Sequence, residues 1–348
     1  MKKTICIMLC ALTVLMLLAL PFAVPSGSML YDYQDQWMEW AWDSEALVRL
    51  LLPAARAEEA AASLPIDLSP GMEPNPAAYT ETSYEDNSIT VRIEHIEDEE
   101  KNLSWRVAYV QIQDPSQLRT GVAGNNVKAE RTSTVSSMAE KYKAVIAING
   151  DYFINDTQKK SFEFRMGQKI RSLPNAYKDI LIIDENGDFH IITIDSVPDG
   201  KAEVDAAKAV QQAQIDAIKA EHQIINAFTF GPALVKDGEL INRDITYDFN
   251  RTGDEPRCAI GQMGPLSYVL VLAEGRGGYA DGVTQQELAN FMYDEIGCLQ
   301  AYNLDGGNSG TIVLGKTIYK ADHATTKLRD LNDCIYFATT VDPASWSK

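Results

Sequence analysis

A carboxylate, a run of glycines and a hydroxyl follow directly on an apolar segment near the C-terminus. The apolar run of residues 298–304 leads into Asp305, Gly306, Gly307, Asn308, Ser309 and Gly310. Glycines let the backbone approach a ligand closely, so their N–H groups can converge on an anion or a sugar oxygen. The sequence therefore predicts a binding turn in which Asp305 stands beside converging amides.

A second apolar run ends in a comparable turn. Residues 144–148 lead into Asn149, Gly150 and Asp151, which supply an amide and a carboxylate. Asn, Asp and Gly dominate tight turns for backbone reasons, so either turn alone is explained as a turn. Both together predict one shared pocket. Neither matches a phosphate loop or a dinucleotide fingerprint, because Gly-Lys-Ser/Thr and a Gly-x-Gly-x-x-Gly opening a helix are missing.

The charge balance excludes one class of partner. The 348 residues carry a formal charge of −18, and after residue 28 there are 29 basic against 49 acidic side chains. Nucleic-acid backbones and anionic membrane surfaces repel such a chain, and no Lys/Arg-rich run offers a basic patch. We therefore exclude nucleic acid as a partner.

The N-terminus has the pattern of an export signal. Lys2 and Lys3 precede an uncharged apolar segment, residues 5–20, which Pro21 and the small residues 26–28 close. We expect a secreted protein or one at the extracytoplasmic face of the cell membrane. Because about 20 apolar residues span a bilayer, residues 1–28 are predicted to be either a cleaved signal peptide or a membrane anchor.

The remaining chain divides into a spacer, residues 29–80, and one catalytic domain, residues 81–348. The spacer is rich in Trp and Ala, and its four prolines between residues 65 and 76 favour an extended linker. In the domain, alternating patterns predict strands, a hairpin over residues 180–194 and a mostly solvated helix over 203–222. Several strand pairs look antiparallel, so we predict an α+β fold with mixed, largely antiparallel sheets and flanking helices.

Cysteines and histidines show no metal-binding pattern along the chain. Cys258, Cys298 and Cys334 are widely spaced, which predicts buried thiols, with one bridge as the alternative. The four histidines are scattered, which argues against a zinc site. No cofactor is required by the sequence; the Asp-bearing turns leave a divalent cation such as Ca²⁺ open, although no loop of alternating acids is present.

Five motifs, taken in order, resemble the phosphodiester glycosidase domain family of the mammalian uncovering enzyme, N-acetylglucosamine-1-phosphodiester α-N-acetylglucosaminidase, and its bacterial relatives. The motifs lie between residues 90 and 341 and comprise residues 147–153, 230–235, 256–261, 303–309 and the late Arg329. Asp151 and Asn308 depart from the family pattern, which often has Gly at both positions.

The resemblance implies hydrolysis of a sugar-1-phosphodiester at the anomeric carbon. Phosphate is a good leaving group, and a guanidinium binds its oxygens in two places at once, which makes Arg257 and Arg329 candidates. An oxocarbenium-like transition state needs a nearby carboxylate. The catalytic candidates are, in order, Asp305, Glu274 and Asp151. The substrate-binding candidates are Asn149, Gly150, Gly231, Arg257, Gly306, Gly307, Asn308, Ser309 and Arg329.

We therefore expect an exported hydrolase whose partner is a sugar-phosphate-containing glycan of the envelope or the extracellular polysaccharide. Two alternatives stay open. One is a non-catalytic protein of the same fold that binds glycans or assists exopolysaccharide assembly. The other is a metal-dependent phosphodiesterase that cleaves the P–O bond, for which a His/Asp metal cluster is the expected signature.

Overall fold

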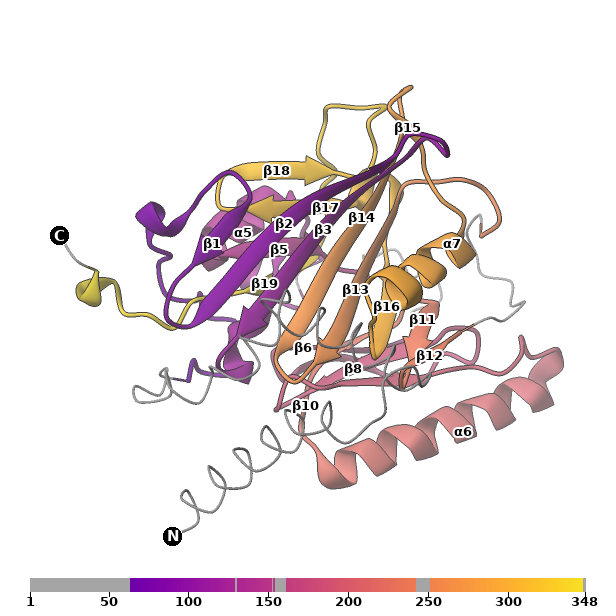
Figure 1. Ribbon diagram of the computed structural model, residues 1–348. Coiled ribbons are helices and arrows are strands. Elements are labelled where there is room, and N and C mark those ends of the chain that lie inside the picture. Colours follow the sequence, from indigo (N-terminus) through magenta and orange to yellow (C-terminus); the bar gives the residue numbers. More distant parts are fainter. Residues whose placement is uncertain (1–62, 129, 152, 154–160, 242–250, 347–348) are drawn as a thin grey trace, which may run out of the picture. The chain divides into compact units, whose positions relative to one another are not determined.

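The computed structural model describes residues 63–128, 130–151, 153, 161–241 and 251–346. Residues 61–348 form one compact unit, which is built mainly from three antiparallel sheets (Figure 1). The predicted signal or anchor, residues 1–28, lies outside the described residues. No helix in the described ranges combines the length and the apolar character needed to cross a membrane.

The largest sheet has nine strands, and its central strands supply one wall of the core. Its order is β1-β2-β3-β14-β13-β16-β11-β12, with β15 paired to β14. The strands are β1 Ser83–Glu85, β2 Ile89–Asp98, β3 Leu103–Ile112, β11 Ala233–Lys236, β12 Glu239–Leu240, β13 Arg257–Gly264, β14 Ser267–Arg276, β15 Ala280–Asp281 and β16 Gln300–Leu304.

Two five-stranded sheets complete the β structure. The sheet that we call the β5 sheet has the order β18-β17-β5-β19-β4, and the β8 sheet has the order β7-β6-β10-β8-β9. The β5 sheet comprises β4 Leu118–Val122, β5 Ile146–Asn149, β17 Thr311–Leu314, β18 Thr317–Lys320 and β19 Asp333–Phe337. The β8 sheet comprises β6 Phe162–Arg165, β7 Gln168–Ser172, β8 Ile180–Asp184, β9 Phe189–Ile192 and β10 Ile224–Phe228.

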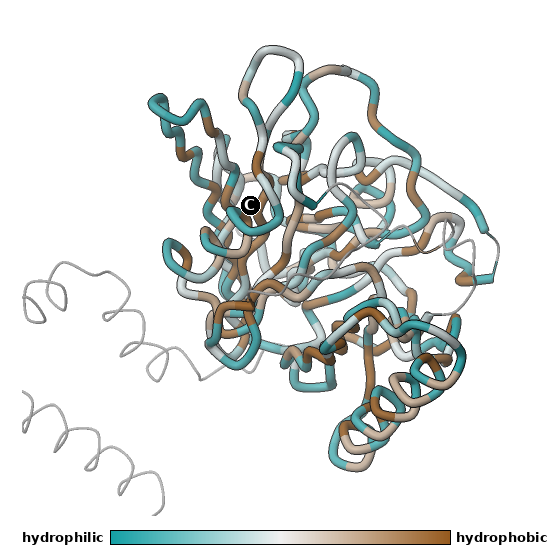
Figure 2. The backbone as a smooth tube through the Cα atoms, turned by 90° about the vertical axis from the view of Figure 1, so that its right-hand side faces the viewer, coloured by the Kyte–Doolittle hydropathy of each residue, from teal (hydrophilic) through white to brown (hydrophobic). Residues whose placement is uncertain are grey.

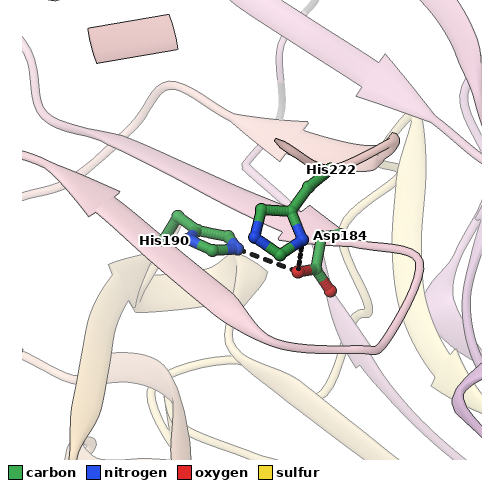
Figure 3. A group of neighbouring side chains, drawn as sticks. All are labelled: Asp184, His190 and His222. Carbon is green, nitrogen blue, oxygen red and sulfur yellow. Dashed lines mark hydrogen bonds and ion pairs between the residues drawn. The ribbon is translucent and has the colours of Figure 1, made fainter. Parts of the chain in front are cut away.

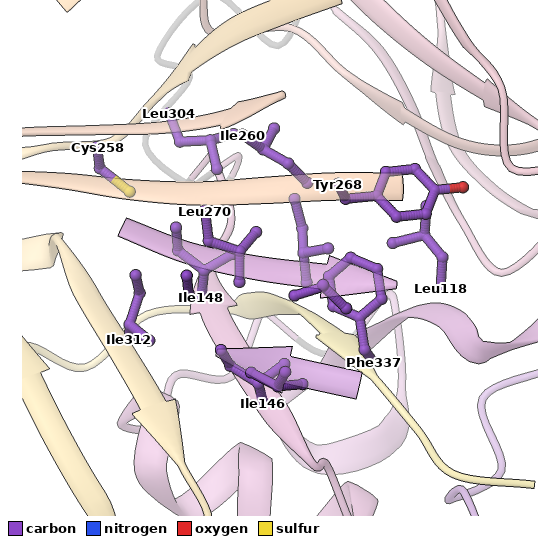
Figure 4. Packing of buried hydrophobic residues seen from close by; sticks show 14 of the residues in the cluster. Leu118, Ile146, Ile148, Cys258, Ile260, Tyr268, Leu270, Leu304, Ile312 and Phe337 are labelled. Carbon is purple, nitrogen blue, oxygen red and sulfur yellow. The ribbon is translucent and has the colours of Figure 1, made fainter. Parts of the chain in front are cut away.

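The main core lies between the nine-stranded sheet and the β5 sheet, with further side chains from the β8 sheet. Ile260 and Leu270 of the first sheet pack with Ile148 and Ile312 of the second (Figure 4). Residues facing this core alternate with residues on the opposite face, as the two-residue period of a strand requires. Burying these apolar faces is the main driving force that joins the sheets.

Helices cover the outer faces of the sheets. Helix α7, Gln285–Asn290, continues into a π-helical turn, Phe291–Glu295, and packs on the far face of the nine-stranded sheet. Helix α5, Val135–Tyr142, packs on the far face of the β5 sheet. Helix α6, Gly200–Glu221, lies along the β8 sheet (Figure 1) and buries Ile215 there.

The prediction of largely antiparallel sheets with flanking helices is confirmed in its main point. Every strand pairing among the described strands is antiparallel, so the expected parallel component is confined to one isolated bridge, Gly275 to Asp322. Sheets outweigh helices, and hydrophobic residues concentrate in the interior strands while loop tips are hydrophilic (Figure 2). The 180–194 hairpin and the long helix α6 form as predicted.

Part of the predicted spacer is anchored to the domain. The fully buried Arg119 donates to the carbonyl oxygens of Pro65, Asp67 and Ser69, at 2.9, 3.1 and 3.2 Å. Leu64 and Leu68 are buried as well. From residue 64 on, the proline-rich segment therefore packs against the domain.

All three cysteines after residue 28 are buried and unpaired, which confirms the prediction of buried thiols over that of a bridge. The polar turns at the ends of β5 and β16 lie beside one of these thiols, Cys258. Cys258 donates its S–H to the Oδ1 atom of Asn149 at 3.3 Å. The ends of these two strands are where the chemistry of the chain is concentrated.

Candidate active site

The two Asp-bearing turns meet, and Asn149 joins them. Its Nδ2 group donates to the carbonyl oxygen of Asp305 at 2.7 Å, and its Oδ1 atom accepts from the N–H of Thr311 at 3.1 Å. Asn149 is fully buried at the end of β5. Because its side chain is engaged at both ends with the Asp305 turn, it positions that turn.

The glycines after Asp305 allow the turn to sit against the start of β13. A Cβ atom on Gly306 would lie 2.7 Å from the carbonyl oxygen of Pro256, a distance that real side chains do not adopt. Gly307 has a φ of +56° and donates its N–H to the same carbonyl oxygen at 2.8 Å. Close approach and positive φ therefore require glycine at these two positions.

The Asp305 carboxyl group is buried in an environment that disfavours its charge. Burial raises its pKa to about 6, and the neighbouring charge of Asp151 contributes to the rise. A hydrogen bond from Ser309 and the positive charge of Arg329 act in the opposite direction. Its Oδ2 atom is buried and has no hydrogen-bond partner among the described residues. A carboxylate of this kind is available to act on a bound molecule.

Ser309 and Asn308 extend the polar surface around Asp305. The Nη1 group of Arg329 donates to the Oγ atom of Ser309 at 3.2 Å, so the cation, the hydroxyl and the carboxylate lie together. The Oδ1 atom of Asn308 is a second buried acceptor without a donor in the described part of the chain. Leaving a buried acceptor unpaired costs about 1–3 kcal/mol, and the hydroxyl groups of a sugar are suitable donors for both oxygens.

Asp151 belongs to a buried ionic cluster that stands beside Asp305. Its Oδ1 atom accepts from Nη2 of Arg165 at 2.7 Å, and its Oδ2 atom accepts from the N–H of Thr229 at 3.1 Å. Arg165 also donates from Nε to Asp333 at 2.7 Å and from Nη1 to Glu163 at 3.1 Å. All four ionic side chains are at most 1% exposed. One guanidinium thus holds three carboxyl groups.

The pKa of Glu163 is raised in this cluster. Burial raises its pKa well above the usual range, and the neighbouring charge and hydrogen bond of Asp151 raise it further. The charge of Arg165 opposes the shift without cancelling it. The surroundings of Glu163 therefore favour its neutral form, which lowers the charge repulsion within the cluster.

Arg257 is directed away from the Asp305 carboxyl. Its Nε group donates to the carbonyl oxygen of Val283 at 2.6 Å and its Nη2 group to that of Gly253 at 2.8 Å. Successive residues of a strand point to opposite faces, so while Cys258 faces Asn149, Arg257 faces the start of α7. Its backbone lies beside Gly306, but its guanidinium organises the loops around β13.

Glu274 forms a separate cluster. Its Oε2 atom accepts from the hydroxyl of Ser104 at 2.6 Å, and its Oε1 atom accepts from Nε of Arg106 at 3.4 Å. The Nε2 atoms of His323 and His95 lie 3.3 and 3.6 Å from the carboxyl oxygens. The whole of β13 separates β14 from β16. The structure thus brings Asp151, rather than Glu274, into electrostatic contact with Asp305.

The remaining predicted residues support the turns through their backbones. Gly150 donates its N–H to the carbonyl oxygen of Asp333 at 3.3 Å, and a Cβ atom there would collide with the Asp333 carboxyl group. The carbonyl oxygen of Gly231 accepts from Nδ2 of Asn303 at 2.7 Å, one residue before the end of β16. These contacts fix the geometry around Asp305 from two further directions.

Sequence reasoning missed Glu163, Arg165 and Asp333. The alternation of Phe162–Arg165 indicates a half-solvated strand, in which Glu163 and Arg165 are expected on the exposed face. Burial of that face could not be read from the pattern. Sequence reasoning also missed Arg276, whose Nη1 atom lies 3.6 Å from where a Gly307 Cβ would stand and which bonds to Asp322 at 2.7 Å.

With this geometry in place, comparisons identify the family. The model of the phosphodiester glycosidase family matches residues 142–338, more than half of the chain, and this range contains both turns and the Arg165 cluster. The chain belongs to this family. The matched range also includes the two guanidinium groups, Arg276 and Arg329, that lie at the Asp305 turn.

Similar proteins have been described by sequence and by structure. An uncharacterised prophage-derived protein of Bacillus subtilis, YomE, is 30% identical over 187 residues, which are 53% of this chain and 27% of YomE. The catalytic domain of the zebrafish phosphodiester glycosidase N-acetylglucosamine-1-phosphodiester α-N-acetylglucosaminidase, auto-inhibited by its pro-peptide, has a TM-score of 0.50 at 18% identity, covering 85% of this chain and 93% of that one.

A hypothetical protein from Synechocystis has a TM-score of 0.52 at 16% identity, covering 72% of this chain and 62% of that one. At these identities the two likenesses show a shared fold. The chain spans about a quarter of YomE and less than two thirds of the Synechocystis protein.

Proposed function

We propose that this phosphodiester glycosidase family member is an exported hydrolase that cleaves the anomeric C–O bond of sugar-1-phosphodiesters in envelope or extracellular glycans. The observation that carries the proposal is the buried Asp305 carboxyl, which has a pKa of about 6, a guanidinium beside it and an Oδ2 atom without a hydrogen-bond partner in the described ranges. Family membership gives the reaction class. The apolar N-terminal segment supports export.

Asp305 is the proposed group at the anomeric carbon. Above pH 6 its carboxyl group is ionised, and a negative charge next to a developing oxocarbenium ion stabilises the transition state. Its burial strengthens this electrostatic effect, because little water screens the charge. Asn149 keeps the Asp305 backbone fixed, so the carboxylate does not have to be reoriented during the reaction.

Arg329 is the proposed partner of the phosphate. A phosphate leaves as a stable anion, since the second ionisation of a phosphomonoester has a pKa of about 6, and so it needs charge stabilisation more than a proton. Arg329 already lies within electrostatic range of Asp305. It can therefore hold a phosphoryl group next to the sugar that Asp305 contacts, a role for which Arg257 is turned the wrong way.

Product analysis with the full-length protein tests this function. We expect incubation with a panel of sugar-1-phosphodiesters to release a reducing sugar and a phosphomonoester. In ¹⁸O-enriched water the phosphomonoester is expected to stay unlabelled in ³¹P NMR, because the C–O bond breaks. Labelled phosphate or free sugar-1-phosphate would instead indicate P–O cleavage, and saturable binding without release would indicate a glycan-binding protein.

The pH dependence of the reaction tests the role of Asp305. We expect kcat/KM to rise with pH through about 6, as the Asp305 carboxyl group loses its proton. Ser309→Ala removes a hydrogen bond that lowers this pKa, so the rise is expected to move to higher pH. The measurement is a pH profile of kcat/KM for both proteins.

Ser104→Ala is the matched control for that profile. Ser104 donates to Glu274 as Ser309 donates to Asp305, but in the separate cluster. We expect the pH profile of kcat/KM for Ser104→Ala to coincide with that of the unchanged protein. A profile that moves with Ser104→Ala and not with Ser309→Ala would assign the titration to Glu274 and remove Asp305 from the proposed role.

A further inference from the structure

Two histidines and a buried aspartate converge at one end of the β8 sheet. Asp184 ends β8, His190 lies on β9, and His222 follows the last residue of α6. The Nε2 atom of His190 lies 2.9 Å from Oδ2 of Asp184, and the Nδ1 atom of His222 lies 3.0 Å from the same oxygen. Both rings point toward this carboxyl group (Figure 3).

The histidines, which are scattered along the sequence, are paired in the folded protein. All four histidines gather in two pairs, His190 with His222 at Asp184 and His95 with His323 at Glu274. The antiparallel pairing of β8 with β9 and of β8 with β10 brings residues 184, 190 and 222 together. Their spacing along the chain matches no zinc motif, which is why the sequence did not reveal them.

The turn after β8 holds the Asp184 carboxylate in one orientation. Its Oδ1 atom accepts from the N–H groups of Asn186 and Asp188 at 2.8 and 2.9 Å. The side chain is fully buried, so the other oxygen, Oδ2, faces the two imidazole rings. Because the turn fixes this carboxylate with one oxygen facing two imidazole nitrogens, the carboxylate and the imidazoles are already placed as metal ligands would be.

His222 supplies the observation that favours a ligand over a simple hydrogen-bond network. Its Nδ1 atom is buried and makes no hydrogen bond to the described residues, although it lies within ion-pair distance of Asp184. Both histidine side chains are 27% exposed, so an ion has access from solvent. The rings are tilted by 44° with their centroids 4.9 Å apart, so they do not stack on each other.

A fourth ligand is close by. The Oε1 atom of Glu185 lies 3.8 Å from Nδ1 of His222, and its Oε2 atom accepts from the N–H of Gln223 at 2.6 Å. That backbone contact keeps the Glu185 carboxylate beside the ring. Two imidazoles and two carboxylates, or three of these and a water molecule, complete a four-coordinate site.

We propose that Asp184, His190 and His222 bind a divalent transition-metal ion of the zinc type. Their ligand atoms all lie within 4.8 Å of one another. Bonds of about 2.0–2.1 Å in a tetrahedron require ligand separations of roughly 3.3 Å, so small ring movements adapt the site. Imidazole nitrogen selects Zn²⁺ and its neighbours in the periodic table over Ca²⁺ and Mg²⁺, which prefer oxygen ligands.

The bound ion would stabilise the fold by linking helix α6 to the β8 sheet. Helix α6 buries few of its side chains, Gln211 and Ile215 among them, so its own packing on the β8 sheet is limited. A metal bond to His222 ties the end of this helix to the β8–β9 hairpin. We therefore expect the bound ion to stabilise the folded protein, since it binds a site that the unfolded chain lacks.

The other histidine pair provides a matched control. Glu274 already accepts from Ser104 and Arg106, and the positive charge of Arg106 disfavours a cation there. His323→Gln therefore changes a histidine beside a buried carboxylate without changing the proposed site. This proposal does not depend on the glycosidase reaction.

Metal titration tests the site directly. Full-length protein treated with EDTA is expected to bind one Zn²⁺ per chain in calorimetry and to show a higher Tm when Zn²⁺ is added. His190→Gln and His222→Gln are expected to weaken binding by more than about 100-fold, because even the partners of metal ligands contribute 10–100-fold. His323→Gln should bind as the unchanged protein does.

X-ray absorption at the zinc edge on the unchanged protein supplies a test that requires no variant. It is expected to show imidazole scattering from two histidines. The proposal is overturned by the absence of saturable Zn²⁺ binding, by binding that His190→Gln and His222→Gln leave unaltered, or by a spectrum without histidine ligands.

Discussion

Replacing Asp305 with asparagine is expected to reduce sugar release by at least about 10³-fold. The substitution keeps the size of the side chain but removes the charge that stands at the anomeric carbon in the proposed reaction, and such groups contribute factors of 10²–10⁴ or more. The Asn149 contact to the residue 305 carbonyl oxygen does not depend on the side chain, so the turn should persist. Single-turnover kinetics measures the loss.

The same substitution is expected to stabilise the protein near neutral pH. The folded-state pKa of about 6 lies above the ordinary value of 3.8, so the folded protein disfavours the ionised Asp305. The cost is absent below the unfolded pKa, grows as pH rises, and is complete above pH 6, where it is at most about 3 kcal/mol. Urea unfolding should show Asp305→Asn to be the more stable protein at pH 7.5, with a smaller difference toward pH 4.

Glu274→Gln separates this effect from a general response to removing a buried carboxylate. The Glu274 carboxyl group accepts hydrogen bonds from Ser104 and Arg106, so its replacement should lower stability at pH 7.5. Higher stability of Glu274→Gln together with lower stability of Asp305→Asn would contradict our assignment of the disfavoured charge to Asp305. Near-normal turnover of Asp305→Asn would remove this residue from the mechanism.

The sequence was sufficient to predict the two turns and their meeting. The apolar runs before Asn149 and Asp305 predict buried strands, and glycines after a carboxylate indicate close backbone approach. The structure agrees, since Gly306 has no room for a Cβ atom and Asn149 reaches the Asp305 carbonyl oxygen. These features depend on residues that are neighbours in the chain, so they can be predicted from the sequence.

Side-chain direction was the part that the sequence could not provide. Arg257 is a candidate because a guanidinium binds phosphate, and Glu274 because the transition state needs a carboxylate, but the face to which each points depends on the register of β13 and β14. Arg257 pairs with Ala273 across these strands and faces α7. A one-residue change of register would have exchanged the two faces.

The burial of charged side chains could not be predicted from the sequence either. Glu163 and Arg165 alternate with phenylalanines, a pattern typical of a strand with one solvent face. In the folded protein that face meets Asp151 and Asp333, which come from the ends of two strands in another sheet. Only the assembly of the β8 sheet with the β5 sheet converts a polar face into a buried ionic cluster.

Arg165→Met is expected to destabilise the protein by about 3–5 kcal/mol at pH 8 and to abolish turnover. Removing one member of a buried ion network leaves the remaining charges without compensation, here those of Asp151 and Asp333. A buried carboxylate without a cation beside it is protonated more readily as the pH falls, so the loss should be clearly smaller at pH 5 than at pH 8. Urea unfolding at both pH values measures it.

Arg119→Met is the control that separates the effect of uncompensated charge from the effect of removing a buried guanidinium. Arg119 is also fully buried, but its guanidinium donates to carbonyl oxygens, including that of Pro65, and to the Tyr336 hydroxyl. Its ion pair with the exposed Asp67 is long, at 3.9 Å, and its loss mainly leaves neutral acceptors unpaired, so the destabilisation should be nearly the same at pH 5 and pH 8. Equal pH dependence of the two variants would show that Arg165 acts by filling space and not by holding Asp151 next to Asp305.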